Sequence, residues 1–137
     1  MLMRLAPLLL ILLVSSCSSQ PTVTDAQRKA SASWLQLVDS KAYVQSWESS
    51  AELFQKAISK PNWVRQVAGV RNPMGQLLSR TLSSSDVREN LAGQPPGTYT
   101  IFIYRSSFRG KRQAVETHTV YRADSSQPWQ NAGYYIK

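Results

Sequence analysis

Cysteine, histidine and acidic residues are scarce in this chain of 137 residues, which has one Cys, one His and eight Asp plus Glu against 16 Lys plus Arg. A single Cys excludes an internal disulfide, and one Cys with one His cannot supply the usual ligands of a Cys/His metal site. The chain is short for a two-domain enzyme, yet it is too apolar and too aromatic for a disordered protein. The sequence therefore indicates one compact domain, and we expect it to hold no metal and no cofactor.

The only long apolar run lies at the N-terminus. Arg4 precedes an apolar stretch over residues 5–14 that is interrupted only by Pro7, which is the layout of a signal peptide. At about 1.5 Å per helical residue the stretch spans roughly 15 Å, half of the roughly 30 Å hydrocarbon core, so it is too short for a transmembrane anchor. We expect residues 1–16 to be removed.

The residues that follow, Val14-Ser15-Ser16-Cys17, resemble the bacterial lipobox, in which an aliphatic residue and two small residues precede a Cys that is acylated. The only Cys of the chain lies at the position that this signal requires. Simple secretion, with cleavage near Ser16 and a free thiol, is the alternative. The resemblance implies permanent attachment to the bilayer through acylated Cys17, because two or three acyl chains bind far more tightly than one. Ser18, where an Asp tends to retain lipoproteins in the inner membrane, implies the outer membrane and a domain that faces the periplasm.

Residues 17–24 form the lipidated Cys and a tether, because the stretch after Cys17 is rich in Ser, Gln, Pro and Thr and has no apolar period. Apolar residues at helical spacing then predict three helices. The first runs from Thr24 or Asp25 to about Val38. The second begins at Tyr43 and carries a one-sided aromatic stripe, and the third is short and begins near Pro61.

After Gly75 the apolar period changes from that of a helix to that of a strand. We expect four strands, over residues 77–82, 99–104, 115–122 and 129–136. The polar stretch 83–86 leaves open whether the first strand is continuous, bulged or broken. Helices followed by antiparallel strands predict a single α+β domain over residues 25–137, with the helices packed on one face of the sheet.

Spaced Trp, Gly and Tyr residues between residue 30 and the end of the chain form a wider pattern. It includes Trp34, Tyr43, Trp47, Phe54, Trp63, Arg71, Gly75, Arg80, Tyr99, Phe108, Trp129 and Tyr134. The pattern resembles the bacterial domain-of-unknown-function family 4019, which implies an exported or envelope protein and provides no catalytic residues to transfer. The order of elements also resembles the nuclear-transport-factor-2-like and cystatin-like cone folds, in which a curved sheet wraps a long helix.

Because cone folds often enclose a pocket, Asp39, Tyr43 and Arg80 are candidate pocket residues. Asp39 suits a general base, but a cap for the following helix is favoured. Arg80 suits an anion, but an ion pair or an edge position is favoured, and Tyr43 is expected in the core. No nucleophile with a partnered base accompanies them, and the common catalytic and phosphate-binding motifs are absent.

His118 is the only histidine, and Glu116 and Arg122 lie on its own face of the predicted strand. This polar pattern predicts that His118 faces solvent, and a catalytic role is the less favoured interpretation. We therefore predict no catalytic residue.

Four cations fall within one predicted turn region, namely Arg105, Arg109, Lys111 and Arg112. Such a cluster often binds nucleic acid, but the inferred envelope location and the lack of a nucleic-acid motif argue against that partner. A solvated hairpin turn is one interpretation. The other is contact with anionic lipid headgroups or lipopolysaccharide phosphates, to which each cation contributes about 1 kcal/mol.

The sequence as a whole predicts a membrane-anchored envelope lipoprotein that is not an enzyme and binds another envelope protein or an anionic envelope component. One alternative is a pocket-bearing binder of a small apolar ligand, and a less favoured one is a cryptic hydrolase or isomerase that uses Asp39 or His118. A pocket of about 300 Å³ or more lined by Tyr and Trp favours the ligand, whereas a filled core favours surface binding. The enzyme requires two titratable groups that converge in one cleft.

Overall fold

The computed structural model describes residues 21–137, so the predicted signal peptide and Cys17 lie outside the described residues. The chain forms helices α1 (Asp25–Asp39), α2 (Tyr43–Glu48), α3 (Glu52–Ala57) and α4 (Lys60–Met74), then strands β1 (Leu77–Glu89), β2 (Thr98–Phe108), β3 (Lys111–Arg122) and β4 (Gln130–Ile136). The predicted α+β class is confirmed. Between residues 21 and 137, no helix combines the length and apolar character needed to span a bilayer.

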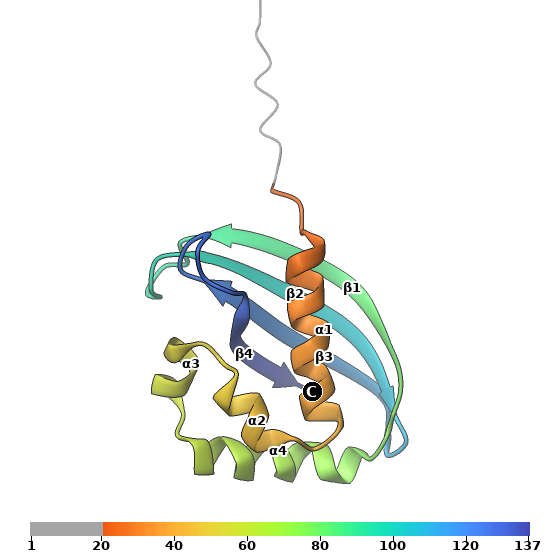
Figure 1. The fold of residues 1–137 in the computed structure, drawn as a ribbon. Helices are drawn as coiled ribbons and strands as arrows, with labels where there is room; N and C mark the ends of the chain where they lie inside the picture. The colour runs from red at the N-terminus through yellow and green to blue at the C-terminus, as the bar shows by residue number, and fades with distance from the viewer. Residues whose placement is uncertain (1–20) are drawn as a thin grey trace, which may run out of the picture.

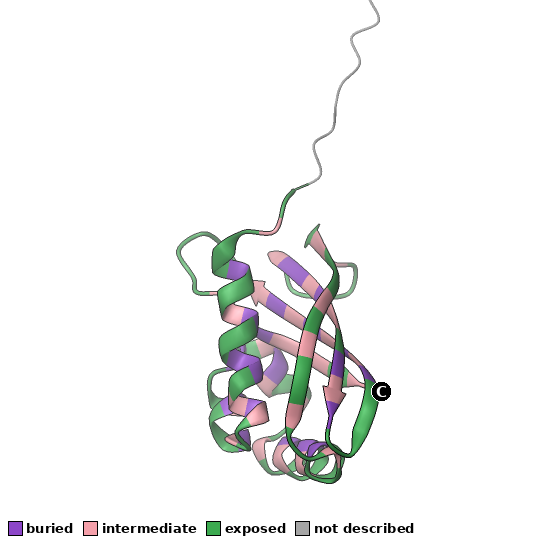
Figure 2. Ribbon diagram, turned by 90° about the vertical axis from the view of Figure 1, so that its right-hand side faces the viewer, coloured by how far each residue is buried: buried purple, intermediate pink, exposed green. Residues whose placement is uncertain are grey.

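The four strands form one antiparallel sheet in the order of the chain, β1-β2-β3-β4. The sheet is curved, and α1 crosses its concave face while α2, α3 and α4 gather beneath one end (Figure 1). In the side view α1 stands on one side of the strands, and other helical turns lie beneath their lower ends (Figure 2). Among the helices that the structure describes, none covers the outer face of the sheet.

The start of α1 is fixed by a capping box. The Thr24 side chain accepts a hydrogen bond from the Gln27 backbone N–H, and the Gln27 side chain accepts one from the Thr24 backbone N–H. Such reciprocal bonds satisfy donors that the first helical turn leaves unpaired. Gln27 also donates to the Thr100 hydroxyl of β2 at 2.8 Å, so the cap places α1 on the sheet.

The expectation of three helices is wrong, because the second predicted helix is divided into α2 and α3. The Ser50 hydroxyl donates to the carbonyl of Ser46 at 2.7 Å, and the Ala51 backbone N–H donates to the carbonyl of Asn131 in β4 at 2.8 Å. Serine side chains that bind nearby carbonyls compete with helical bonding. The bond to β4 then holds the chain outside a helical path.

Strand β1 is continuous and bulged, which settles the alternative left open by its polar stretch. The partner of Leu82 is Tyr104, whereas the partner of Ser84 is Ile103, so Ser83 is the extra residue. A bulge of this kind increases the local twist and bends the strand.

The hydrophobic core lies between the helices and the concave face of the sheet. Its buried cluster comprises Trp34, Leu35, Val38, Tyr43, Phe54, Trp63 and Val67. Tyr43 belongs to this core as predicted, and Tyr99 is also buried. Helices α1 to α4 therefore supply this buried cluster, and Tyr104 of β2 and Tyr134 of β4 pack against it.

Candidate functional site

Two acidic and two basic side chains meet between the end of α1, helix α4 and the concave face of the sheet. We call Asp39, Arg71, Arg80 and Glu116 the ionic cluster. Arg80 binds both carboxylates, with its Nη1 2.7 Å from Asp39 Oδ2 and its Nε 2.6 Å from Glu116 Oε2. Arg71 Nη2 lies 2.8 Å from Asp39 Oδ1. The cluster is therefore neutral as a whole, and its charges compensate one another.

Glu116 is the most enclosed member of the ionic cluster, with no exposed side-chain surface. Besides two bonds from Arg80, its carboxylate accepts hydrogen bonds from the Tyr134 hydroxyl at 2.6 Å and from the Ser106 hydroxyl. A general base must reach the proton that it abstracts, directly or through one water. The oxygens of Glu116 are instead occupied by donors of the protein itself.

The preferred interpretation of Asp39 as a cap is wrong. The N-cap of α2 is Ala42, and no side chain caps that helix. Asp39 instead accepts hydrogen bonds from Arg71 and Arg80. Burial alone raises the pKa of Asp39, but the two guanidinium groups outweigh it and hold this pKa below its ordinary value. Asp39 is accordingly a carboxylate at neutral pH.

The predicted ion pair of Arg80 is confirmed. Burial opposes the charge of Arg80, but its bonds to the two carboxylates prevail and raise its pKa. Of the three candidate pocket residues, the structure brings Asp39 and Arg80 into direct contact. The Tyr43 hydroxyl does not bind that pair and instead donates to Asn72 Oδ1 at 2.8 Å.

The expectation that His118 faces solvent is also wrong, because the side chain is fully buried. Its ring stacks on Trp34 with centroids 4.6 Å apart. Nε2 lies 3.1 Å from Asn131 Oδ1, and Nδ1 lies 2.8 Å from the Ser31 hydroxyl. An amide oxygen only accepts, so Nε2 carries the proton and Nδ1 accepts from Ser31. Burial lowers the pKa of His118 to about 3, and the ring is neutral at physiological pH.

The four cations predicted as a cluster lie around the β2–β3 turn, and we call them the basic turn: Arg105, Arg109, Lys111 and Arg112. All four side chains are exposed, and among residues 21–137 none of them has an ion-pair or side-chain hydrogen-bond partner. The turn lies at the end of α1 opposite the end at which the chain enters that helix (Figure 1).

The family comparison covers most of the fold. A family model described as a protein of unknown function (DUF4019) matches residues 30–134. The chain belongs to the DUF4019 family. No curated protein and no solved structure matches it, so the likeness to cone folds stays a prediction. The matched range of the DUF4019 domain includes the ionic cluster, His118 and the basic turn.

One groove of the DUF4019 domain lies on the uncovered face of the sheet beside the basic turn. Its volume is about 730 Å³, and Arg105 and Arg112 line it together with hydroxyl-bearing residues of β1 and β2. These hydroxyl-bearing residues are Ser79, Thr81, Ser83 and Ser107, whereas Ser106 also lines the groove but directs its hydroxyl to Glu116 on the other face. Guanidinium groups beside hydroxyls are suited to bind phosphate or carboxylate oxygens.

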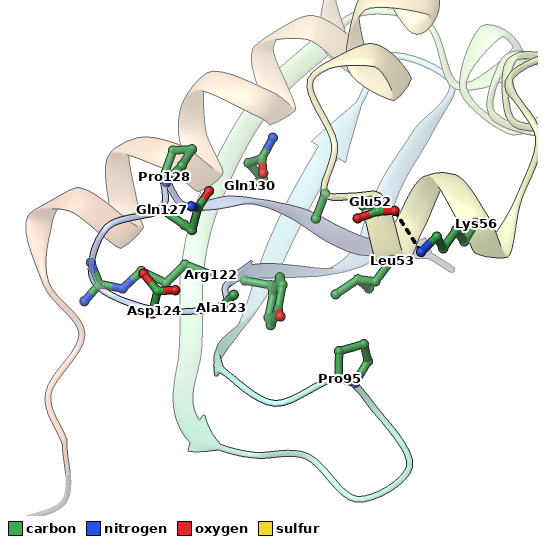
Figure 3. Close-up of a pocket in the computed structure, with 12 residues that line it drawn as sticks. Glu52, Leu53, Lys56, Pro95, Arg122, Ala123, Asp124, Gln127, Pro128 and Gln130 are labelled. Atoms are coloured by element: carbon green, nitrogen blue, oxygen red, sulfur yellow. Dashed lines mark ion pairs between the residues drawn. The ribbon is translucent and has the colours of Figure 1, made fainter.

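A second groove of the DUF4019 domain, of about 430 Å³, lies between α3, the β1–β2 loop and the β3–β4 turn. Glu52 and Lys56 pair with each other on one side of it, while Arg122 and Asp124 lie on the other side (Figure 3). The carboxylates of this groove therefore do not converge on one point, as an acid–base pair requires.

Three residues of the buried network were not singled out by sequence reasoning as site residues: Arg71, Glu116 and Tyr134. One signal was present for Glu116 and His118. They lie on the same face of the strand as the apolar residues Ala114 and Val120, since every second residue of a strand points to the same side. All four are buried, so the apolar neighbours at that spacing indicated the concave face.

Proposed function

We propose that this protein is a bacterial outer-membrane lipoprotein, anchored through acylated Cys17, whose DUF4019 domain is a binding module and not an enzyme. Its ligands are the phosphate groups of anionic lipids or lipopolysaccharide. The observation that carries the proposal is the basic turn, whose four exposed cations have no partner within residues 21–137 and two of which line a groove with hydroxyl groups. Clustered cations that the fold leaves unpaired remain available to an anionic ligand.

The contrast with the ionic cluster supports a role in binding over one in catalysis. Asp39 and His118 were the candidate bases, and both have their polar atoms engaged by neighbouring side chains. A neutral, fully buried imidazole with a pKa of about 3 is also far from the operating range of a general base. These groups are better suited to holding the fold together than to turning over a substrate.

The distance between the anchor and the basic turn is compatible with contact at the same membrane. Helix α1 has 15 residues and is about 22 Å long. An extended tether over residues 17–24 reaches up to about 28 Å. The tether is thus long enough for the domain to lie lengthwise along the bilayer, with the basic turn at the headgroups.

A small apolar ligand is less well supported. The groove of the domain that is lined by Trp and Tyr has a volume of about 240 Å³, below the roughly 300 Å³ at which ligand pockets begin. The space beneath α1 is filled by the core and by the ionic cluster.

The proposal predicts salt-dependent binding of residues 21–137 to vesicles that contain anionic phospholipid, and weak binding to vesicles of phosphatidylcholine alone. Changing Arg105, Arg109, Lys111 and Arg112 to Gln should weaken binding at least tenfold, because each cation near the surface contributes about 1 kcal/mol. Vesicle co-sedimentation over a range of salt concentrations measures this, and lipopolysaccharide aggregates serve as a second target.

A matched control removes the same charge elsewhere, with Arg28, Lys29, Lys41 and Arg65 changed to Gln. These side chains are also exposed. The proposal expects the control to lose much less affinity than the basic-turn variant. Equal losses of vesicle affinity in the two variants would show that binding responds to net charge alone. Unchanged binding of the basic-turn variant would exclude the basic turn as the lipid-binding site and favour an envelope protein as the partner.

A further inference from the structure

A groove of about 240 Å³ runs between α4 and the outer edge of β4. Helix α4 contributes Trp63, Gln66, Val67, Val70 and Arg71, and β4 contributes Tyr134, Tyr135 and Ile136. Successive residues of a strand point to opposite faces of the sheet. Because three successive residues of β4 line the groove, the groove follows the edge of the strand and not one of its faces.

Between residues 21 and 137, the backbone of Tyr134 and Ile136 on this edge has no partner. Val115 of β3 and Lys137 exchange two backbone hydrogen bonds. In an antiparallel pair every second residue points its N–H and C=O groups toward the partner strand, so the next residue of β4 that does so is Tyr135, opposite Thr117. The peptide groups of Tyr134 and Ile136 therefore point away from β3, toward the groove. Ala51 binds the same edge at Asn131, but within residues 21–137 no strand or loop backbone pairs with Tyr134 or Ile136.

The rim of the groove is apolar and open to solvent. The exposed large apolar residues of the described chain are Val44, Val70, Leu78 and Tyr135, and two of these four lie on this groove. Between residues 21 and 137, one buried side-chain nitrogen or oxygen atom lacks a hydrogen-bond partner, and it is Arg71 Nε. Arg71 also lines the groove, but its Nε is buried and its Nη1 and Nη2 bind Tyr134 and Asp39 inside the fold. The groove therefore offers a ligand its apolar rim and the edge of β4.

We propose that the groove between α4 and β4 binds an extended segment of a partner protein, which adds to β4 as a fifth strand. Unpaired N–H and C=O groups that recur at every second residue are matched by another strand, and such addition is a general mode of peptide recognition. The small volume suits one or two apolar side chains of the segment, packed against Val67 and Val70. The site lies apart from the basic turn and stands independently of the function proposed for it.

The test uses residues 21–137 and a synthetic probe, an acetylated and amidated peptide of alternating valine and threonine with one glutamate at each end. Amide NMR titration and hydrogen exchange report where it binds. We expect saturable binding, with slowed exchange at the Tyr134 and Ile136 amides. Val70→Asp should weaken binding at least about tenfold, because it removes an apolar contact and places a carboxylate in the groove.

The matched control is Val44→Asp, since Val44 on α2 is 42% exposed and Val70 is 44% exposed, and Val44 does not line the groove. Val44→Asp should bind the probe like the wild type, and so should the basic-turn variant. Absence of binding, slowed exchange elsewhere, or equal losses from Val44→Asp and Val70→Asp would each overturn the proposal. So would a dimer in sedimentation whose Tyr134 and Ile136 amides exchange slowly without the probe, because the edge would then be closed by a second copy.

Discussion

Replacing Arg80 by methionine should lower the free energy of unfolding by about 3–5 kcal/mol, the range found when one partner of a buried ion pair is removed. The change leaves the carboxylates of Asp39 and Glu116 with one nearby cation, Arg71, whose Nη1 lies 3.8 Å from Glu116 Oε1. Methionine retains much of the packing of the arginine stem, so most of the loss arises from uncompensated charge. Urea unfolding of residues 21–137 at neutral pH measures the difference.

The control for this experiment is Arg88→Met in the same strand. Arg88 pairs with Asp86, and both side chains are exposed. Exposed pairs contribute about 0–1 kcal/mol, so this variant should unfold close to the wild type. Glu116→Gln introduced together with Arg80→Met should destabilise by less than the sum of the single changes, because the two groups interact directly. Similar losses from Arg80→Met and Arg88→Met would contradict a stabilising role of the ionic cluster.

Acidification from pH 7 to pH 5 should destabilise the domain by about 2 kcal/mol through His118. In the fold its pKa is lowered to about 3, whereas the ordinary value of 6.5 applies in the unfolded chain. The unfolded state therefore binds more protons below pH 6.5, and the stabilising contribution is complete above that pH and is lost as the pH falls toward 3. The slope approaches about 1.4 kcal/mol per pH unit between these limits. Urea unfolding at a series of pH values measures it.

His118→Gln provides the control, because His118 is the only histidine in the chain. The variant should be less stable at pH 7, since glutamine cannot reproduce the stacking on Trp34. Its stability should nevertheless change little between pH 7 and pH 5. The pKa of Asp39 is held below its ordinary value of 3.8, so this carboxylate titrates outside that interval. A variant that keeps the full loss would show that another group is responsible.

The fold followed from the sequence where a local period was strong. The cap at Thr24, the order of the four strands and the β2–β3 turn are as expected, because capping residues, alternating apolar residues and Gly-containing turns act over short distances. The first three strands are longer than expected, and β1 continues through its polar stretch to Glu89. The division of the second helix did not follow, because it depends on a bond between Ala51 and Asn131, 80 positions apart in the chain. A contact of that kind leaves no periodic signal.

The burial of His118 and Glu116 was missed for a related reason. The sequence does not show which face of β3 is buried. The outward residues Val115, Thr117 and Thr119 are all β-branched, as core residues of a strand often are, while the buried face includes two titratable side chains. Charged residues are seldom fully buried unless they are paired. The partners of Glu116 come from β1, β2 and β4, and no alternation within β3 identifies them.

The proposed attachment of the domain to the membrane through Cys17 is tested directly by palmitate labelling in cells. The wild-type protein should incorporate labelled palmitate and sediment with the outer membrane, and Cys17→Ser should incorporate none. Cys17→Ser combined with Ser18→Cys should also remain unlabelled, because the thiol is then displaced by one residue from the position that the lipobox requires. Equal labelling of the wild type and Cys17→Ser, or an unlabelled wild type, would contradict the proposal.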